Sequence, residues 1–373
     1  MRTQSRACGA GTLSVPTAPP PTLGDEIADG TSSPSDGLVL AWGWNAHGQL
    51  GLGDDNVRPD PRPLRSLLAS GVRICFLSAG SSHSVAVDDR GGAYSFGGNS
   101  HGQLGVGDCG DRLVPCRLDT DGQRVMDVAC GARHTVLCTA RGRVFGCGDH
   151  AQGQLGLGPL SDDPSAVSLD LVESLNVRPR TLASMSGVRC SALSAGFAHT
   201  LFLTRPGQVL ACGAGESGQL GTGSAEERVT LPAVVGGLAS VACCAVAAGN
   251  YHSCALARDG GGVYTWGEGR YGRLGHGTAA SELLPRLVHG LLATKVDVLT
   301  CGGACTACID DGGGLWTWGS ASWGQCGHGT QVVDELEPRY VQALAAYPLR
   351  SVGCAEDHMV GVSRGGQVRS LGH

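Results

Sequence analysis

The sequence predicts an all-β fold, a β-propeller of four-stranded blades, from three observations. A glycine-rich phrase, WGWNAHGQLGLG at residues 42–53, occurs six times in full. Its leading glycine recurs every 51 to 65 residues, a period typical of solenoids, propellers and arrays. The stretches between the phrases hold short apolar runs separated by Gly and Asp turns, as in all-β proteins. Four such strands per repeat correspond to one propeller blade.

The repeat at 241–288 shows the expected order of strands most clearly. Apolar runs at 241–247 and 252–257 are followed by a turn at 258–261 and a third strand at 263–266. A short fourth strand is expected at 284–288, where Pro285 is tolerated because the outer edge of a blade faces solvent. The other complete repeats are expected at 75–118, 125–171, 188–235 and 296–341.

The number of blades depends on how the two ends of the propeller are counted. Five repeats of four strands, two strands at the start and three at the end give 25 strands. This total makes six blades plus one strand, or seven blades with pieces missing. Residues 7–15 faintly resemble 129–137. If this segment is a decayed first strand pair, strands from both termini would close the ring and remove an exposed edge.

The chain divides into a tail and a single propeller. Residues 1–36 are rich in Pro, Ser, Thr and Gly and cannot bury enough apolar surface to fold alone, so a flexible tail is expected. An organelle-targeting segment within residues 1–24 is the alternative interpretation. Residues 37–373 form the propeller. The longest spacing between phrases predicts a surface insertion at about 159–187, in a blade-to-blade connection.

Composition excludes several classes of function. The net charge of −6 and the pI near 6.0 argue against electrostatic binding of nucleic acid or anionic lipid. No apolar run is long enough to span a membrane. Many of the 17 cysteines occupy repeat positions that are apolar in other copies, as expected in a reducing compartment. We therefore expect a cytoplasmic or nuclear protein.

No motif predicts a cofactor, a metal or a catalytic group. The two G-x-G-x-x-G matches, at 213–218 and 267–272, arise from the repeat and precede a turn and a strand rather than a helix. Cys301, Cys305, Cys308, Cys326 and His328 have a zinc-like spacing. However, Cys305 and Cys308 point to opposite faces of one strand. We expect neither a cofactor nor a metal site, and we do not expect an enzyme.

A second half-motif, Gly-x-x-His-Ser/Thr, alternates with the phrase. It occurs at 80–84, 131–135, 196–200 and 249–253. Cys305 replaces the histidine at 302–306, and His358 belongs to a last copy that carries one extra residue. From residue 37 to the C-terminus, the two half-motifs together resemble the regulator of chromosome condensation family of β-propellers. The resemblance implies a propeller that normally has seven blades.

Residues that recur once per blade are expected to be structural. The glycines permit positive φ in tight turns. We expect the leucine of each phrase to fill the space between blades, the glutamine before it to bond loop backbone groups, and the histidines to bond the backbone. The predicted structural residues are Gly43, Gly97, Gly148, Gly213, Gly267, Gly319, His83, His134, His199, His252 and His358.

The variable residues between the glycines of each phrase predict a protein-binding rim. The last variable position holds His47, His101, Gln152, Ser217, Tyr271 and Trp323, while its flanks stay nearly constant. Trp44, Tyr271 and Trp323 are the expected anchors, because aromatic residues dominate interface energetics. The alternative is that they pack against neighbouring loops. The predicted function is a protein-interaction scaffold for an unidentified partner protein, through Trp44, His47, His101, Tyr271 and Trp323.

The family resemblance implies two other functions. One is guanine-nucleotide exchange on a Ran-like small GTPase, which needs no catalytic acid or base. The wedge hairpin and basic tail that the family uses for it have no counterpart in this sequence, so the scaffold is preferred. The other is ultraviolet-B reception, because residues 131–135 are one residue from a repeated G-W-R-H-T signature. Ala132 replaces that tryptophan and the chain has six Trp in all, which disfavours this function.

Overall fold

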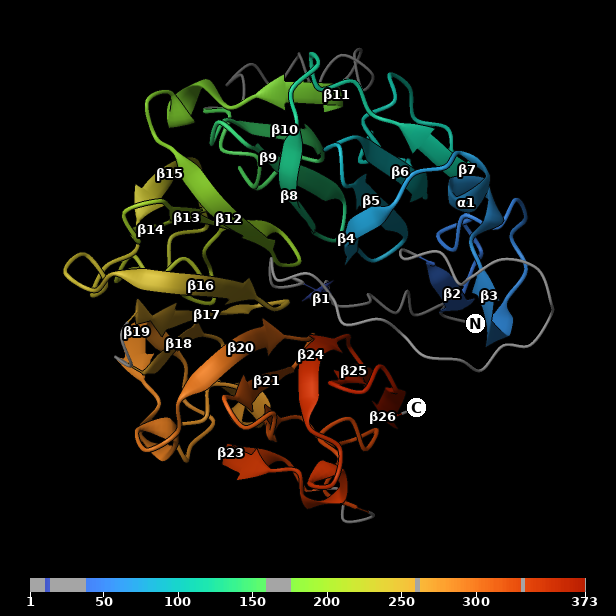
Figure 1. The fold of residues 1–373 in the computed structure, drawn as a ribbon. Coiled ribbons are helices and arrows are strands. Elements are labelled where there is room, and N and C mark those ends of the chain that lie inside the picture. Colours follow the sequence, from blue (N-terminus) through green and yellow to red (C-terminus); the bar gives the residue numbers. More distant parts are fainter. Residues whose placement is uncertain (1–10, 14–37, 159–175, 259–261, 330–332, 373) are drawn as a thin grey trace, which may run out of the picture.

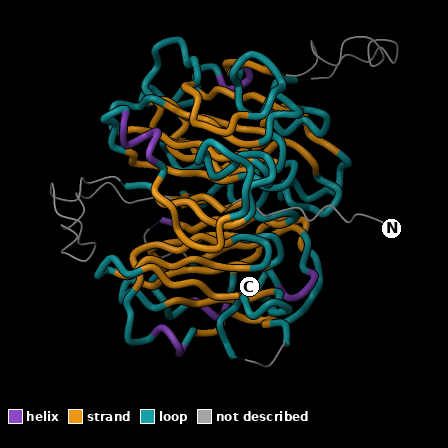
Figure 2. Tube along the Cα trace, turned by 90° about the vertical axis from the view of Figure 1, so that its right-hand side faces the viewer, coloured by secondary structure: helices purple, strands orange, loops and turns teal. Residues whose placement is uncertain are grey.

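The computed structural model describes residues 11–13, 38–158, 176–258, 262–329 and 333–372. The strands in these ranges form seven antiparallel sheets around a ring (Figure 1). Seen from the side, strands of successive sheets lie in stacked layers (Figure 2). This arrangement confirms the predicted all-β propeller. No helix in the described ranges is long and apolar enough to cross a membrane.

Five of the sheets are complete four-stranded blades. Blade 1 comprises β4 (Ile74–Ala79), β5 (His83–Asp88), β6 (Ala93–Gly97) and β7 (Arg112–Arg117). Blade 2 comprises β8 (Val125–Cys130), β9 (His134–Thr139), β10 (Val144–Gly148) and β11 (Asn176–Thr181). Blade 3 comprises β12 (Cys190–Ala195), β13 (His199–Thr204), β14 (Val209–Ala214) and β15 (Arg228–Val234). Blade 4 comprises β16 (Cys243–Ala248), β17 (His252–Ala257), β18 (Val263–Gly267) and β19 (Glu282–Leu287). Blade 5 comprises β20 (Val296–Cys301), β21 (Cys305–Asp310), β22 (Leu315–Gly319) and β23 (Glu335–Tyr340).

The ring is completed by two smaller sheets. Blade 6 has three strands, β24 (Leu349–Cys354), β25 (His358–Ser363) and β26 (Val368–Gly372). The half-blade pairs β2 (Leu40–Gly43) with β3 (Arg58–Pro63) and lies between blade 1 and blade 6 (Figure 1). Short helical turns connect the sheets, namely α1 (Arg65–Ala69), η1 (Ala183–Met185), η4 (His289–Leu291) and η5 (Gln342–Leu344), whereas η3 (Arg270–Gly272) lies in a loop within blade 4. Five four-stranded blades, one three-stranded blade and the two-stranded half-blade give the 25 strands expected from the sequence.

One further strand, β1 (Gly11–Leu13), bears on the closure of the ring, which the sequence left open. It pairs antiparallel with β4, so that Gly11 lies opposite Ala79, and it also contacts β24. Thus β1 extends the inner edge of blade 1 and does not form the first strand pair of a separate blade. The strand β26 shares no sheet with β2 or β3, so within the described residues blade 6 and the half-blade are not joined by strand pairing. The remainder of the predicted tail lies outside the described residues.

Glycine geometry shows that β2 lacks the inner neighbour that its equivalents have. A Cβ on Gly97 would lie 2.5 Å from the carbonyl oxygen of Ser82, the residue just before the neighbouring strand β5. The leading glycines of blades 2 to 6 meet the same kind of backbone carbonyl. A Cβ on Gly43 would meet no described atom within 4 Å, although its φ of +103° matches the +105° of Gly97. The half-blade therefore corresponds to the third and fourth strands of a blade.

The insertion predicted at 159–187 is placed differently by the structure. The fourth strand of blade 2 is Asn176–Thr181, so the expected end of this repeat at residue 171 was wrong. Residues 159–175 lie outside the described residues. They join the phrase of blade 2 to β11, and the extra length is therefore inside a blade rather than between two blades.

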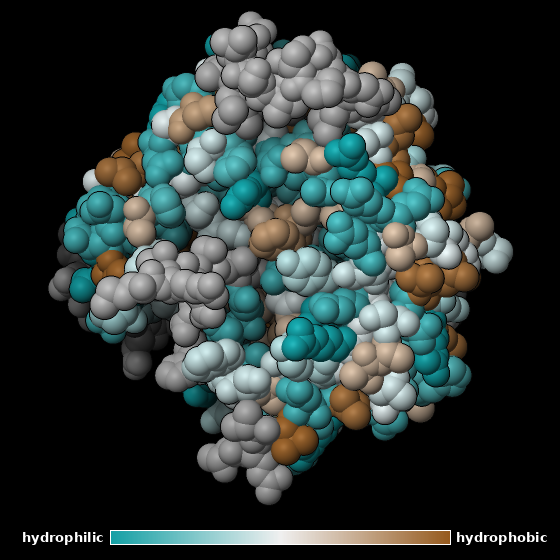
Figure 3. Space-filling view, turned by 180° about the vertical axis from the view of Figure 1, so that it is seen from behind, coloured by the Kyte–Doolittle hydropathy of each residue, from teal (hydrophilic) through white to brown (hydrophobic). Residues whose placement is uncertain are grey.

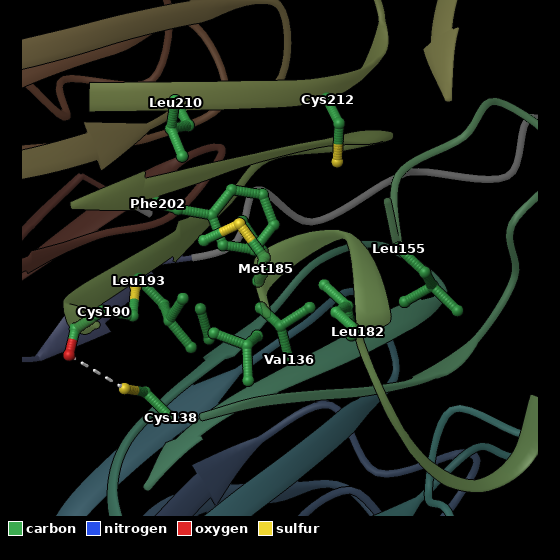
Figure 4. Close-up of a cluster of buried hydrophobic side chains, with 13 residues drawn as sticks. Val136, Cys138, Leu155, Leu182, Met185, Cys190, Leu193, Phe202, Leu210 and Cys212 are labelled. Atoms are coloured by element: carbon green, nitrogen blue, oxygen red, sulfur yellow. Dashed lines mark hydrogen bonds between the residues drawn. The ribbon is translucent and has the colours of Figure 1, made fainter. Parts of the chain in front are cut away.

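Apolar cores fill the interfaces between blades. Between blades 2 and 3, Phe202 and Met185 pack against Leu155 and Leu182, all at most 4% exposed (Figure 4). Every phrase leucine in the described residues is buried, as predicted, and Cys326 takes this place in blade 5. The half-blade is the exception, because Trp42 is 38% exposed whereas its repeat equivalent Trp266 is fully buried.

Candidate protein-binding rim

The variable loops of the phrases stand together on one side of the ring. Each loop begins at the leading glycine, which ends the strand before it in every sheet but blade 3, where β14 continues to Ala214. A tight turn follows, as when the Gly48 amide donates to the Asn45 carbonyl at 2.8 Å. Because the third strands run in the same sense in every blade, the loops emerge at the same rim. We call these loops the phrase rim.

The phrase glutamines hold the rim backbone in place. The Gln49 Oε1 atom accepts a hydrogen bond from the backbone amide of His47 at 3.0 Å. Four further glutamines accept the same bond from the last variable residue of their loops at 2.8 to 2.9 Å; they are Gln103, Gln154, Gln219 and Gln325. The predicted role of these side chains is therefore seen in five loops. Such bonds fix the backbone from which each variable side chain projects.

Blade 4 departs from this pattern and forms a different local site. Arg273 occupies the glutamine position and is only 3% exposed. Its guanidinium donates to Glu268 at 2.8 Å and lies 5.5 Å from the centre of the Tyr271 ring. The exposed Arg270 stacks on the same ring at 5.0 Å. Burial lowers the pKa of Arg273, and the neighbouring Glu268 carboxylate opposes that shift.

Tyr271 adopts an unusual backbone conformation in this loop. Its φ is +63°, in a left-handed region that bulky residues rarely adopt. Such strain often occurs at functional sites, where the surrounding structure holds it in place. Here the two arginines, one on each side of Tyr271 in the chain, supply cation–π contacts to its ring.

Two tryptophans project from the rim into solvent. Trp44 on the half-blade is 66% exposed and Trp323 on blade 5 is 42% exposed. The interpretation that they pack into neighbouring loops does not describe Trp44, which has the largest exposed fraction of any large apolar residue in the described chain. Tyr271 is partly buried, and its loop and that of Trp323 belong to neighbouring blades.

The two rim histidines make polar contacts. The His47 ring lies 3.0 Å from a carboxylate oxygen of Asp111, a residue of the blade 1 loop that the sequence did not single out. The other Asp111 oxygen accepts from the Asn99 amide, so this carboxylate joins two neighbouring loops. His101 contacts the Ser100 hydroxyl at 2.9 Å. Burial and the nearby Arg133 lower the pKa of His101.

Apolar side chains are dispersed over the visible surface. The face opposite to that of Figure 1 shows separate apolar patches among hydrophilic residues (Figure 3). The exposed apolar residues include outer-strand residues such as Leu231 on β15 and Leu284 on β19. The phrase rim differs from these strands in presenting its exposed aromatic residues, Trp44 and Trp323, on loops.

Comparison with known proteins identifies the family. The family model described as the RCC1-like domain matches residues 33–367. The chain belongs to the RCC1-like domain family. This assignment confirms the resemblance that the two half-motifs indicated.

Relatives of this RCC1-like domain include larger proteins. The ultraviolet-B receptor UVR8 of Arabidopsis thaliana is 32% identical over 308 residues, which cover 82% of this chain and 66% of that protein. The human E3 ubiquitin-protein ligase HERC2 is 31% identical over 327 residues, which cover 87% of this chain and 6% of that protein. The chain thus spans about two thirds of one relative and a small part of the other.

Solved structures share the fold. Human WBSCR16 matches with a TM-score of 0.75 at 22% identity, over 96% of this chain and 99% of that one. Prp20p of Saccharomyces cerevisiae, whose structure was described with its binding to Gsp1p and histones, matches with a TM-score of 0.60 at 20% identity, over 90% and 91% of the two chains. At these identities the likeness establishes the propeller architecture.

The repeated histidines of this RCC1-like domain are buried between blades, opposite the leading glycines of the phrases. His83 Nε2 lies 2.9 Å from the Thr135 hydroxyl of the next blade, and that hydroxyl donates to the Gln103 carbonyl at 2.7 Å. Since the hydroxyl has one hydrogen, the histidine ring must donate to it. We call this arrangement the hydroxyl belt. It recurs for His134 with Thr200, His199 with Ser253 and His252 with Thr306, at 2.9 to 3.0 Å.

The belt corrects one expectation and explains the charge state of the histidines. The rings bond side-chain hydroxyls of the neighbouring blade and reach the backbone only through them. Burial lowers the pKa to about 4 for His83 and His199 and to about 3 for His134, and well below its usual value for His252. These rings are therefore neutral at pH 7, with their single ring hydrogen on Nε2.

The belt changes at blades 5 and 6. Cys305 stands at the histidine position, and Met359 stands at the hydroxyl position of the next blade; both are fully buried. An apolar contact thus replaces a hydrogen bond, with both partners changed. His358 is exposed, and among the described residues its ring forms no hydrogen bond. The sequence pattern Gly-x-x-His-Ser/Thr contained the hydroxyl residues, but their partners 52 to 66 residues away were not predicted.

Proposed function

We propose that this RCC1-like domain is a protein-interaction scaffold that binds a partner protein through the phrase rim. The observation that carries the proposal is the exposure of Trp44 and Trp323 on loops fixed by glutamine side chains. A large aromatic side chain on a rigid backbone can bury much apolar area at little entropic cost. The proposal assigns no catalytic role to any residue.

The sector of blades 4 and 5 supports a mixed apolar and charged contact. Tyr271 and Trp323 project from equivalent positions of neighbouring blades, and Arg270 adds an exposed cation beside Tyr271. Tyr, Trp and Arg are the residue types enriched in interface hot spots. The half-blade adds Trp44 and the His47–Asp111 contact at another point of the rim.

A quantitative capture experiment tests the proposal. Wild-type protein, a Tyr271→Ala/Trp323→Ala double variant and a Trp44→Ala variant would be immobilised at equal density, and co-purified proteins quantified by mass spectrometry. Leu284→Ala is the matched control, because it removes an apolar side chain 46% exposed on the outer strand β19. We expect partners that the wild type and Leu284→Ala retain and that the double variant loses at least tenfold. Equal retention by all variants would rule out the rim as the binding surface.

A small GTPase is the alternative partner. The fold match to Prp20p, described with its binding to Gsp1p, favours this class. Nucleotide exchange would require the chain to accelerate release of a fluorescent guanine nucleotide from a Ran-like GTPase. Micromolar protein that leaves the release rate unchanged removes this candidate, whereas the capture experiment still tests the scaffold. We also propose that the protein resides in the cytoplasm or the nucleus. Imaging a tagged form of it in cells would test this.

Ultraviolet-B reception is the remaining candidate, supported by the 32% identity to UVR8. Three tryptophans of this chain have packing roles within the blades. Trp266 and Trp318 are fully buried in the cores between blades, and Trp316 packs edge-on against Tyr340. We therefore rank this function last. An oligomeric state that changes under ultraviolet-B light would restore it.

A further inference from the structure

Two cysteines face each other across the interface of blades 4 and 5. Cys254 on β17 and Cys301 at the end of β20 have their Sγ atoms 3.0 Å apart. Cys254 is fully buried and Cys301 is 2% exposed, in the apolar cluster that also contains Trp318. We propose that Cys254 and Cys301 form an oxidisable pair, a site of disulfide formation that links the two blades.

The repeat shows that this pair is specific to one interface. The positions equivalent to Cys254 hold Val85, Val136, Leu201, Ala307 and Val360. The positions equivalent to Cys301 hold Ala79, Cys130, Ala195, Ala248 and Cys354. Val85 is thus the counterpart of Cys130 and Ala307 the counterpart of Cys354, although the Cys354 thiol itself bonds Cys305 of blade 5. Other interfaces also carry thiols on both sides, Cys138 with Cys190 and Cys305 with Cys354, but only at blades 4 and 5 are both of these equivalent positions cysteine.

The geometry favours a disulfide over a metal site. His252, Cys254 and Cys301 offer three possible ligand atoms within 4.8 Å of one another. Two thiolates bound to tetrahedral zinc at 2.3 Å each lie about 3.8 Å apart. The observed 3.0 Å is shorter, and a disulfide at about 2.05 Å requires the sulfurs to approach by about 1 Å. In addition, His252 Nε2 is already engaged with the Thr306 hydroxyl at 2.9 Å.

The oxidation balances with a peroxide as the two-electron oxidant. One thiolate attacks a peroxide oxygen, the O–O bond breaks, and a sulfenic acid and water result. The second thiol attacks the sulfenic sulfur, the S–S bond forms, the S–O bond breaks and a second water leaves. Two thiols are oxidised and one peroxide is reduced to two waters. Burial raises the pKa of Cys301, so the thiolate is scarce and the reaction waits on opening of the interface.

The test compares thiol oxidation in the wild type and in variants that copy other repeats. Reduced protein would be treated with hydrogen peroxide, alkylated in denaturant and digested for peptide mass spectrometry. Cys254→Val and Cys301→Ala introduce residues that this fold already accommodates at equivalent positions. Cys308→Ala is the control, because Cys308 lies in the same buried cluster as the pair but on a different strand. We expect a Cys254–Cys301 cross-link in the wild type and in Cys308→Ala. We expect none in Cys254→Val or Cys301→Ala.

Stability gives a second measurement that does not depend on peptide assignment. Joining residues 47 positions apart restricts the unfolded chain, so the oxidised wild type should unfold at a higher urea concentration than the reduced protein. Dithiothreitol should reverse this shift, and Cys301→Ala should show none. Intact Cys254 and Cys301 thiols after oxidation would overturn the proposal. So would a Cys305–Cys354 cross-link in its place, or one equivalent of zinc that the reduced protein retains and Cys254→Val loses.

Discussion

Removing one hydroxyl from the belt tests whether it couples neighbouring blades. In Thr200→Val, the His134 ring loses the acceptor that lies 3.0 Å from its Nε2 atom, and the Gln154 carbonyl loses a donor at 2.6 Å. Both side chains are fully buried, so water cannot replace either partner. One buried unsatisfied polar group costs about 1–3 kcal/mol. Because the carbonyl is also affected, we expect the free energy of unfolding to fall by about 2–4 kcal/mol.

Urea unfolding at pH 7.5, followed by tryptophan fluorescence and circular dichroism, measures the change. Thr230→Val is the matched control, since Thr230 lies on the half-exposed outer strand β15. It should change the free energy of unfolding by no more than about 0.5 kcal/mol. If Thr200→Val is as stable as Thr230→Val, the belt does not stabilise the interface and the reasoning fails.

Blades 5 and 6 suggest a rescue of the same interface. Cys305 and Met359 replace both members of the belt there with apolar side chains. Replacing both partners of a buried hydrogen bond can be nearly neutral. The His134→Cys/Thr200→Met double variant should therefore be more stable than the sum of its two single variants predicts, by about 1–2 kcal/mol. Additive effects would show that the residues act independently.

Three further predictions use matched positions of the repeat. The belt histidines are neutral in the folded state, so below pH 6.5 the unfolded chain binds more protons than the folded one. The free energy of unfolding should therefore have its full value above pH 6.5 and fall toward pH 4, by up to about 1.4 kcal/mol per pH unit for each ring. A flat profile of urea midpoints would contradict this. Gly97→Ala should destabilise by several kcal/mol more than Gly43→Ala, whose cost is about 1–2 kcal/mol for its positive φ alone, because only at Gly97 does the new Cβ meet a carbonyl. Equal denaturation midpoints for the two variants would show that β2 does not lack an inner neighbour. Trp266→Ala should lower the free energy of unfolding by about 3–5 kcal/mol and Trp42→Ala by about 1 kcal/mol, because Trp266 is buried and Trp42 is partly exposed. A calorimetric Tm that falls further in Trp42→Ala than in Trp266→Ala would contradict this.

The sequence predicted what each repeat contains and missed what joins one repeat to the next. Strand order, the buried phrase leucines and the glutamine bonds all lie within one repeat, so their spacing is visible in the chain. The belt was not predicted, because His83 finds its partner 52 residues away in another blade. The one available signal was the paired change at Cys305 and Met359, where loss of the histidine coincides with loss of the hydroxyl.

The sequence left ring closure open for a related reason. Residues 7–15 resemble a strand of the repeat, and the structure does form a strand at 11–13. That strand pairs with the open inner edge of blade 1 instead of building a new blade. Local resemblance can predict a strand, but the edge that it meets is set by the whole ring.

The half-blade also determines which part of the phrase rim is best ordered for binding. The exposed Trp42, the empty space beside Gly43 and the exposed His358 share one cause, because the half-blade has no inner strand pair in the described chain. Trp44 projects from this least braced sheet. The loops of Tyr271 and Trp323 belong instead to blades joined by the bond between His252 and Thr306.

A partner that contacts blades 4 and 5 therefore meets anchors whose positions are already fixed, and binding there costs less ordering entropy. By this argument Trp323 and Tyr271 should contribute more to affinity than Trp44, even though Trp44 is the more exposed tryptophan.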